Sequence, residues 1–365
     1  MTESQKATGE RDLTRETSTT GRQSMADTTA PRAFVVISGK AVHEALDGCE
    51  EELLDLVEHG YLLHGDGSTV NPPSYFLRFP DRPSDRIIAL PASVGGDVAV
   101  SGIKWISSFP ANVEKGIPRA SAVVVLNDQE TGYPLACLEG SVISAVRTAA
   151  SAALAAVKLG AGRPKPRKLG IVGTGLIARF VHTHLRAAGV ECEEVGLFDH
   201  SAEHARGFAG YLARAGAPRT TVHDDLESLV RSSDLLLFAT TAGTPHVEDP
   251  AWFVHHPLVL HVSLRDLSPE VVLDSCNVVD DVEHCLKAAT SVHLAEQATG
   301  NRDHVHTTLY DVLTGRFTPP NDRTVVFSPF GLGVLDLVVS RHVYDRNTDG
   351  VVVDDFFHEL SRYGG

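Results

Sequence analysis

The sequence predicts an α/β protein in which a doubly wound parallel sheet is joined to a second part of the α+β class. Two observations support this prediction. From residue 168 onward, short apolar runs alternate with helical patterns, which is typical of a parallel sheet covered by helices. Between residues 34 and 138, most apolar runs are strand-like and separated by turns, which indicates a region rich in antiparallel strands.

Composition places the chain among ordinary globular proteins. Its 365 residues are 42% hydrophobic and 22% charged, which is enough for two domains with a core each. The formal net charge of −15 argues against non-specific binding to nucleic acid or to an anionic membrane. No apolar run reaches the roughly 18–20 residues that span a bilayer. We therefore expect a soluble protein that binds neither nucleic acid nor membrane.

Cysteine and histidine usage predicts neither disulfides nor a metal site. The five cysteines are scattered, odd in number and without a C-x-x-C pair, as expected for reduced thiols in the cytoplasm. The 18 histidines include close pairs, but none has the H-E-x-x-H spacing of a helical zinc site. These pairs are His182 with His184, His255 with His256, and His304 with His306.

Two changes in composition divide the chain. Residues 1–31 are rich in Thr, Ser, Glu and Arg and nearly devoid of large apolar residues, which predicts a disordered tail. The basic, proline-containing stretch GAGRPKPRK predicts a domain boundary. We expect one domain over 32–160, rejoined by 320–365, and another over 165–319.

In the first domain, strand-like runs surround one amphipathic helix. Leu53, Leu54 and Val57 fall on one face of a helix over 50–64. The Ala-rich stretch 139–159 contains few helix breakers and predicts a long helix that leads to the boundary. Strands are expected at 34–37, within 71–99, at 102–106, at 120–126 and at 133–138.

In the second domain, the alternation begins with a short β-branched run, 169–172, that predicts a buried parallel strand. A helical pattern starts at Leu176 and closes at Gly189, and a second strand covers 195–198. The segment from about Val325 is expected to return to the first domain. Further helices are expected at 202–215 and 226–231, and further strands at 220–223, 235–239 and 258–264.

The first strand of this domain ends in the glycine-rich turn Gly173-Thr174-Gly175. Gly173 allows a tight turn, Gly175 lets the backbone approach a pyrophosphate, and Ala178 lets the helix pack closely on the strand. Asp199, at the end of the second strand, can accept the ribose hydroxyls of NAD and would repel the 2′-phosphate of NADP. An ordinary βα turn with a surface aspartate is the alternative. The order of strand, glycines, helix, strand and acid favours a Rossmann site for NAD.

Three cations interrupt apolar segments outside this nucleotide site. Arg78 lies in YFLRF, Lys104 in GIKW and Arg147 in SAVRTAASA. A charge in such a setting costs free energy unless it is paired or faces an anion. One interpretation is that each of these residues forms a structural salt bridge or reaches water from the end of a strand. Together the three cations favour recognition of a carboxylate.

Five motifs, IKWISSFPAN, TGYPLA, SAVRTAASA, VGTGLIA and SPFGLGVLDL, occur in this order. Together they resemble the ornithine cyclodeaminase/μ-crystallin family, from about Phe34 to Tyr344. Within that family, NPPSYFLRFP, RIIALPAS, SGIKW, PRASAVVVLND and VSLRDLSPE look most similar to the N-(2-amino-2-carboxyethyl)-L-glutamate dehydrogenase branch. Enzymes of this branch make L-2,3-diaminopropionate for siderophores and peptide antibiotics, and the resemblance implies the same product here.

The resemblance also implies roles for single residues. Arg78 and Lys104 match residues that hold the carboxylate of the substrate, and Arg147 matches an arginine between substrate and cofactor. Phe330 and Gly331 fall where the family closes its substrate pocket. The contacts expected for NAD are Arg147, Gly173, Thr174, Gly175, Leu176, Asp199, Thr240, Thr241, Ser263 and Leu264.

Asp266 matches the proton-transfer acid of the cyclodeaminase V-G-G-D motif. This chain reads Val262-Ser263-Leu264-Arg265-Asp266, and the loss of both glycines argues against a plain ornithine cyclodeaminase. We expect Asp266 to be the base that a secondary amine needs before it can give up hydride. A helix cap for the segment that begins at Ser268 is the alternative role.

The function that the resemblance implies is NAD-dependent cleavage of N-(2-amino-2-carboxyethyl)-L-glutamate to L-2,3-diaminopropionate and 2-oxoglutarate. It implies a cytoplasmic oxidoreductase acting on a CH–NH group, and a homodimer formed through the first domain. An ornithine cyclodeaminase or ketimine reductase is one alternative. A non-catalytic binding protein similar to μ-crystallin is another, although Arg78, Lys104 and Asp266 together exceed what binding alone would require.

Overall fold

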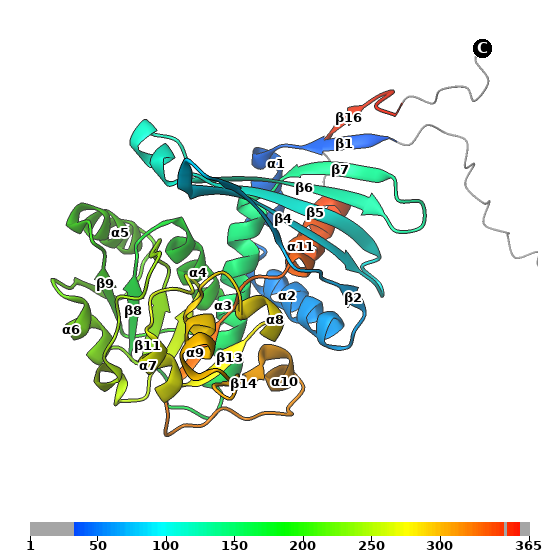
Figure 1. Cartoon of the computed structure of the whole chain (residues 1–365). Coiled ribbons are helices and arrows are strands. Elements are labelled where there is room, and N and C mark those ends of the chain that lie inside the picture. The colour runs from blue at the N-terminus through cyan, green and yellow to red at the C-terminus, as the bar shows by residue number, and fades with distance from the viewer. Residues whose placement is uncertain (1–32, 347–348, 358–365) are drawn as a thin grey trace, which may run out of the picture. The chain divides into compact units, whose positions relative to one another are not determined.

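Two eight-stranded sheets form the framework of the protein (Figure 1). The computed structural model describes residues 33–346 and 349–357. The predicted tail, 1–31, lies outside the described residues, as do 347–348 and the last residues of the segment expected to rejoin the first domain. Residues 33–356 belong to one compact unit. The predicted division into two domains therefore stays a prediction.

Sheet A has the strand order β16-β1-β7-β6-β5-β4-β2, and β3 also pairs with β4. All its pairings are antiparallel except that of β1 with β7. Its strands are β1 (Phe34–Ile37), β2 (Thr69–Val70), β3 (Tyr75–Phe79), β4 (Arg82–Val94), β5 (Val100–Ser108), β6 (Ala120–Asp128), β7 (Pro134–Glu139) and β16 (Val351–Val353).

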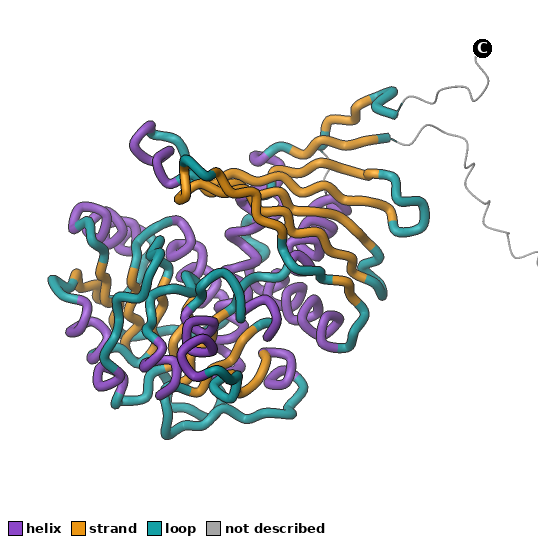
Figure 2. The backbone as a smooth tube through the Cα atoms, in the orientation of Figure 1, coloured by secondary structure: helices purple, strands orange, loops and turns teal. Residues whose placement is uncertain are grey.

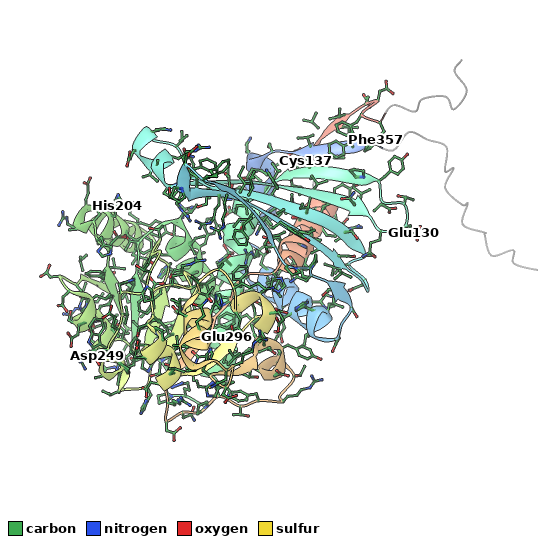
Figure 3. All side chains as sticks on the ribbon, in the orientation of Figure 1. Glu130, Cys137, His204, Asp249, Glu296 and Phe357 are labelled. Carbon is green, nitrogen blue, oxygen red and sulfur yellow. The ribbon has the colours of Figure 1, made fainter. Side chains whose placement is uncertain are left out.

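Helices cover one face of sheet A (Figure 2). They are α1 (Gly39–Leu46), α2 (Glu50–Gly65), α3 (Ser141–Gly160) and α11 (Gly333–Arg346), with α11 against β4, β5 and β6. A short 3₁₀ helix, Pro110–Lys115, joins β5 to β6. The other face carries apolar side chains that remain exposed, namely Val36, Tyr75, Leu77, Trp105 and Val123. Cys137 of β7, labelled in Figure 3, is half-buried in the same sheet.

Helix α3 connects the two sheets. The Glu139 carboxylate accepts hydrogen bonds from the backbone N–H groups of Ser141 and Val142, at 2.8 and 3.1 Å, which explains why the helix begins at Ser141. By length and composition α3 could cross a membrane, but most of it is buried inside the protein, as in the core helix of a globular fold. Its Ala-rich sequence suits that position because small side chains let neighbouring helices approach.

Sheet B is parallel throughout, in the order β10-β9-β8-β11-β12-β15-β13-β14. Its strands are β8 (Lys168–Val172), β9 (Glu194–Phe198), β10 (Arg219–Val222), β11 (Leu235–Phe238), β12 (Leu258–His261), β13 (Cys276–Val279), β14 (Val305–Thr308) and β15 (Val325–Ser328). The helices of this part are α4 (Leu176–Ala187), α5 (Ala202–Arg214), α6 (Leu226–Arg231), α7 (Pro269–Asp274), α8 (Val282–Cys285), α9 (Ser291–Thr299) and α10 (Leu309–Leu313), with a 3₁₀ helix at Pro250–Phe253.

The predicted fold class is confirmed, with two corrections to its details. The segment from Val325 does not return directly to the first sheet, because β15 pairs with β12 and β13 in sheet B before α11 rejoins sheet A. All four β15 residues are buried, so their apolar run could have suited either core. The strand expected at 258–264 ends at His261. It does not extend to Leu264, because the φ of that residue is left-handed, at +71°.

Candidate active site

The predicted glycine turn joins β8 to α4. Gly173 has a φ of +85°, and a Cβ there would lie 2.7 Å from the carbonyl oxygen of Ala239, so the turn accepts only glycine. A Cβ at Gly175 would meet no atom within 4 Å, which leaves open space beside the N-terminus of α4. Leu176, the first residue of α4, is exposed. This arrangement suits a pyrophosphate against free backbone N–H groups.

Asp199 follows β9 and holds this turn in place. Its Oδ2 accepts hydrogen bonds from the backbone N–H and the hydroxyl of Thr174, both at 2.8 Å, and its Oδ1 accepts one from the Ser201 N–H. Burial raises the pKa of Asp199, but these hydrogen bonds outweigh burial and lower it overall. The half-buried carboxylate is therefore ionised at neutral pH, as selection of a ribose diol over a 2′-phosphate requires.

Asp266 is fully buried in a polar cluster after β11 and β12. The hydroxyls of Thr240 and Ser263 each donate a hydrogen bond to one of its oxygens, and Nε2 of His261 lies 3.1 Å from Oδ2. Three predicted residues thus meet, whereas Thr241 is exposed. His261 was not predicted as a site residue, although a histidine that ends the apolar strand LVLH was a usable signal.

The environment of Asp266 fixes its charge. Burial raises its pKa, but hydrogen bonds from His261, Ser263 and Thr240, together with the field of His261, lower the pKa to about 2. A general base works best when its pKa lies near the working pH. Asp266 is therefore better suited to hold a permanent negative charge than to exchange protons at pH 7.

A cavity of about 180 Å³ lies between the inner face of sheet A and the loops that follow β12 and β15. Its lining contains four residues predicted for substrate binding, Lys104, Arg147, Phe330 and Gly331, and Leu264, predicted to contact NAD. The remaining lining residues are Phe76, Arg86, Ile88, Leu90, Ile106, Ser144 and Arg265. The cavity thus combines an apolar wall with an excess of cations.

Asp336 of α11 binds two of these cations. Its Oδ2 lies 2.5 Å from Nζ of Lys104, and its Oδ1 lies 3.1 Å from Nε of Arg147. The carboxylate is fully buried, and the two cations are nearly so. Nζ of Lys104 also donates to Ser144 at 3.2 Å. Asp336 was not predicted as a site residue, although a lone acid inside the apolar helix segment GVLDLVV was a signal for a buried partner.

The turn at Phe330 and Gly331 is held by Asp280. This buried carboxylate accepts hydrogen bonds from the backbone N–H groups of Phe330 and Gly331, at 2.9 and 2.6 Å. Gly331 has a φ of +92°, and a Cβ there would lie 2.4 Å from Nη1 of Arg147. The turn can therefore approach the guanidinium only because residue 331 is glycine.

Arg78 does not line this cavity. It is exposed, with its guanidinium 5.0 Å from the centre of the Phe76 ring. The residue directly opposite it in the hairpin, Arg86, lines the cavity instead. Arg86 was not predicted as a site residue because it begins the apolar run RIIALP and resembles a flanking surface charge.

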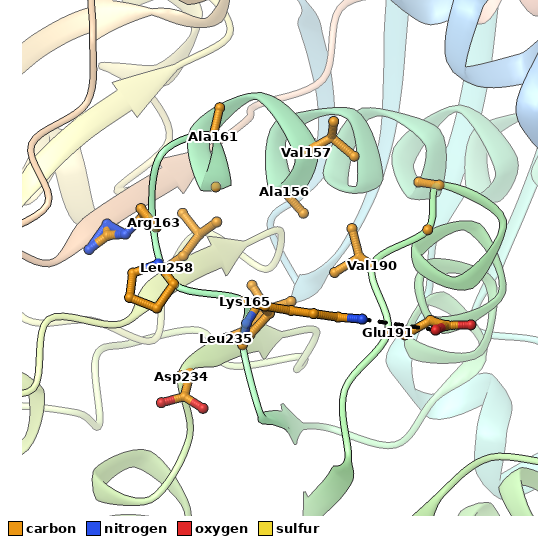
Figure 4. A pocket seen from close by; sticks show the side chains of 15 residues that line it. Ala156, Val157, Ala161, Arg163, Lys165, Val190, Glu191, Asp234, Leu235 and Leu258 are labelled. Carbon is orange, nitrogen blue, oxygen red and sulfur yellow. Dashed lines mark ion pairs between the residues drawn. The ribbon is translucent and has the colours of Figure 1, made fainter.

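A larger cavity, of about 400 Å³, lies elsewhere (Figure 4). Its walls include the end of α3, the stretch from Arg163 to Pro166 and the first residues of β11 and β12, Leu235 and Leu258. Lys165 and Glu191 form an ion pair at its edge, 4.0 Å apart. This cavity lies at the amino ends of the strands, whereas ligands of such sheets bind beyond the carboxyl ends. None of the predicted site residues lines it.

The family model of the ornithine cyclodeaminase/mu-crystallin family matches residues 36–351. The chain belongs to this family. The predicted family is thereby confirmed over nearly the whole described chain.

Individual relatives agree with this assignment. The N-((2S)-2-amino-2-carboxyethyl)-L-glutamate dehydrogenase of Staphylococcus aureus is 27% identical, with 86% of this chain and 96% of that protein covered. The Δ1-pyrroline-2-carboxylate reductase of Thermococcus litoralis, solved with NADH and L-proline, is 25% identical with a TM-score of 0.78 over 85% of this chain and 96% of that chain. An archaeal alanine dehydrogenase dimer with bound NAD has the same identity and TM-score over 89% of this chain and all of that chain.

These comparisons support two further predictions. The predicted enzyme class, an NAD-dependent oxidoreductase acting on a CH–NH group, is confirmed. NAD as the cofactor is confirmed as well. The individual site residues stay predictions. Within residues 33–346 and 349–357, no group of three or more His, Cys, Asp and Glu side chains is arranged for a metal ion.

If Lys104 binds a carboxylate, as predicted, its pKa makes that binding depend on pH. Burial lowers this pKa, Asp336 opposes the shift and Arg147 adds to it, and the result is about 8. As pH rises through 8 the ammonium group loses its charge. We expect the Kd of 2-oxoglutarate, measured by quenching of bound NADH fluorescence, to rise up to tenfold per pH unit above pH 8.

The matched control is Lys104→Gln, which lacks the charge at every pH. Its Kd should be high at pH 7 and should not change up to pH 9.5. A wild-type Kd that stays constant over this range would show that Lys104 does not supply the charge.

Proposed function

We propose that this protein catalyses the NAD-dependent oxidative cleavage of N-(2-amino-2-carboxyethyl)-L-glutamate to L-2,3-diaminopropionate and 2-oxoglutarate. The observation that carries the proposal is the charge of the 180 Å³ cavity. Four cations, Arg86, Lys104, Arg147 and Arg265, line it. Within the described residues, Asp336 is the one carboxylate that forms an ion pair with any of them. Such a cavity suits a substrate with several carboxylates, and the proposed substrate carries three.

The same charge argues against the other enzymes of the family. Ornithine has a cationic side chain, which Arg86 and Arg265 would repel. Alanine and pyrroline-2-carboxylate carry one carboxylate each and would leave most of the positive charge unpaired. The Staphylococcus aureus relative, whose name states this dehydrogenase activity, supports the same choice.

In the proposed chemistry the glutamate Cα of the substrate would give up a hydride to NAD, which the turn of Gly173 to Gly175 and Asp199 would hold. The C–N bond becomes an imine, and water adds to the imine carbon. The C–N bond then breaks, which releases 2-oxoglutarate and diaminopropionate, and the overall reaction yields NADH and one proton. In our proposal Asp266, ionised and held by Thr240, Ser263 and His261, stabilises the positive charge that develops on the nitrogen.

The deciding experiment monitors NADH absorbance with purified protein, NAD and N-(2-amino-2-carboxyethyl)-L-glutamate, with ornithine in parallel. We expect NADH to accumulate only with the first substrate, and mass spectrometry to detect diaminopropionate and 2-oxoglutarate in equal amounts. Proline formed from ornithine without net NADH would identify a cyclodeaminase instead. NAD binding without turnover of either substrate would favour a non-catalytic binding protein.

The role of Asp266 has its own test. Asp266→Asn keeps the shape of the side chain and removes its charge, so kcat should fall roughly 10²–10⁴-fold while the Kd of NAD stays within about twofold. Because the pKa of Asp266 is about 2, its carboxylate stays ionised between pH 9 and pH 5. Protonation of this group should therefore cause no loss of the wild-type kcat in that range. An unchanged kcat in the variant would refute the assignment.

We further propose that two copies of the chain associate through the exposed apolar face of sheet A. The archaeal relative is described as a dimer, and Tyr75, Trp105 and Val123 leave a large apolar area on this face.

Trp105→Glu should convert the dimer to a monomer in light scattering. Val254→Glu, at an apolar residue that is 66% exposed after the second 3₁₀ helix, should not. A dimeric Trp105→Glu variant would exclude this interface.

The location and the pathway follow from the proposed reaction. All five cysteines are free thiols, which agrees with a cytoplasmic enzyme. We propose that its diaminopropionate enters siderophore or peptide-antibiotic biosynthesis.

A further inference from the structure

Arg86 and Arg265 line one end of the 180 Å³ cavity, and Arg78 and Arg119 lie beside Arg86 outside its lining; we name these four residues the arginine cluster. Arg78 of β3 lies directly opposite Arg86 of β4. Ser108 of β5 lies opposite Arg86 on its other side and accepts a hydrogen bond from Nη1 of Arg119 at 2.8 Å. Arg265 reaches the same cavity from the loop after β12. Sheet A and the nucleotide-binding part thus contribute cations to one place.

The arginine cluster carries charge that no carboxylate of the described residues pairs with. Among the described residues, none of its four guanidinium groups forms an ion pair, in contrast to Lys104 and Arg147, which share Asp336. Arg265 donates from Nε and Nη2 to the carbonyl oxygen of Ala288, at 3.2 and 2.9 Å, which fixes the guanidinium without removing its charge. Arg86 lines the cavity, and its guanidinium has no hydrogen-bond partner among the described residues.

The four charges oppose one another. Burial lowers the pKa of Arg86, and the neighbouring Arg78 lowers it further. Burial, Arg86 and Arg78 likewise lower the pKa of Arg265, with Asp266 acting in the opposite direction. Arginine nonetheless stays charged at neutral pH. A bound anion would relieve this repulsion, and planar guanidinium groups bind carboxylates through paired hydrogen bonds.

The sheet geometry separates this cluster from the Lys104 side of the cavity. Arg86 and Leu90 lie four positions apart on β4, and Leu90 pairs with Lys104, so the two cationic positions are roughly 13 Å apart along the strand. Ile88 and Ile106 lie between them on the same face and also line the cavity. The long side chains of Arg86 and Lys104 shorten the gap, and the isoleucines offer an apolar surface for a short methylene chain.

We propose that Arg86 and Arg265, backed by Arg78 and Arg119, form a second carboxylate subsite for the distal carboxylate of a 2-oxo dicarboxylic acid and of the amino acid derived from it. Lys104 and Arg147 bind the carboxylate beside the reacting carbon, and the methylene groups lie over Ile88 and Ile106. This inference rests on the proposed function for the identity of the whole substrate. The distal-carboxylate subsite itself selects a five-carbon dicarboxylate over a monocarboxylate of equal length.

The test compares two ligands that differ only at the distal end. 2-Oxoglutarate carries a carboxylate where 2-oxopentanoate carries a methyl group. Their Kd values are measured on the full-length protein saturated with NADH, by fluorescence quenching at pH 7. We expect wild-type protein to bind 2-oxoglutarate at least 50-fold more tightly, as expected for two charge-assisted hydrogen bonds or more.

Two variants assign the selectivity to the subsite. Arg86→Gln and Arg265→Gln should each weaken 2-oxoglutarate binding about tenfold to hundredfold and change 2-oxopentanoate binding less than twofold. The matched control, Arg82→Gln, removes an arginine of the same strand that pairs with Asp85 and should bind both ligands as wild type does. If Arg265→Gln fails to fold because it loses its bonds to Ala288, Arg86→Gln carries the test.

Three outcomes would overturn the inference. They are equal wild-type affinity for the two ligands, variants that weaken both ligands alike, and displacement of 2-oxoglutarate by equimolar inorganic phosphate. The result is independent of turnover. Selective binding without cleavage of N-(2-amino-2-carboxyethyl)-L-glutamate would refute the proposed function and leave the subsite intact. Cleavage without selective binding would refute the subsite and support the proposed function.

Discussion

The shared ion pair of Asp336 with Lys104 and Arg147 is the interaction on which the site depends. It joins three elements that are distant in the chain, namely β5, α3 and α11, in the interior where charges are costly to bury. Removal of one partner from such a network costs about 3–5 kcal/mol, because another charge is left uncompensated. The pair also leaves a surplus of one positive charge, and Asp336 opposes the burial that lowers the pKa of Lys104 to about 8. One carboxylate therefore both stabilises the packing of α11 and sets the charge of the cavity.

A second constraint comes from backbone conformation at two glycines. Gly173 and Gly331 both have left-handed φ angles, and at both a Cβ would collide with atoms that belong to the site, Ala239 in one case and Arg147 in the other. Leu264 also adopts a left-handed φ, at a cost of about 1–2 kcal/mol for a residue with a side chain. Its strained backbone turns Leu264 and Arg265 toward the cavity while Asp266 stays buried behind its own hydrogen bonds. Strain of this kind persists where the surrounding structure over-determines the conformation.

Local patterns in the sequence predict more of the nucleotide site than of the cavity. The glycine turn and Asp199 are contiguous with their strands, so period and turn chemistry place them correctly. The cavity depends instead on strand register. Arg78 and Arg86 are both charged residues in one hairpin, and only the pairing of β3 with β4 and β4 with β5 decides which of them lines the cavity. The position of β15 between β12 and β13 likewise depends on long-range pairing, which the short segment VVFS cannot indicate by itself.

The origin of the cavity cations suggests how binding and structure are coupled. Arg86 and Lys104 come from sheet A, Arg147 comes from the connecting helix α3, and Arg265 comes from a loop of sheet B. Among the described residues Asp336 forms ion pairs with Lys104 and Arg147 but with neither Arg86 nor Arg265, and the cations from the two sheets at the outer end repel one another. A ligand with a carboxylate at each end adds the negative charge that the protein itself does not supply there. In the proposed subsite such a ligand would therefore contact the loop after β12 through Arg265 and the β3–β4 hairpin through Arg86 at the same time.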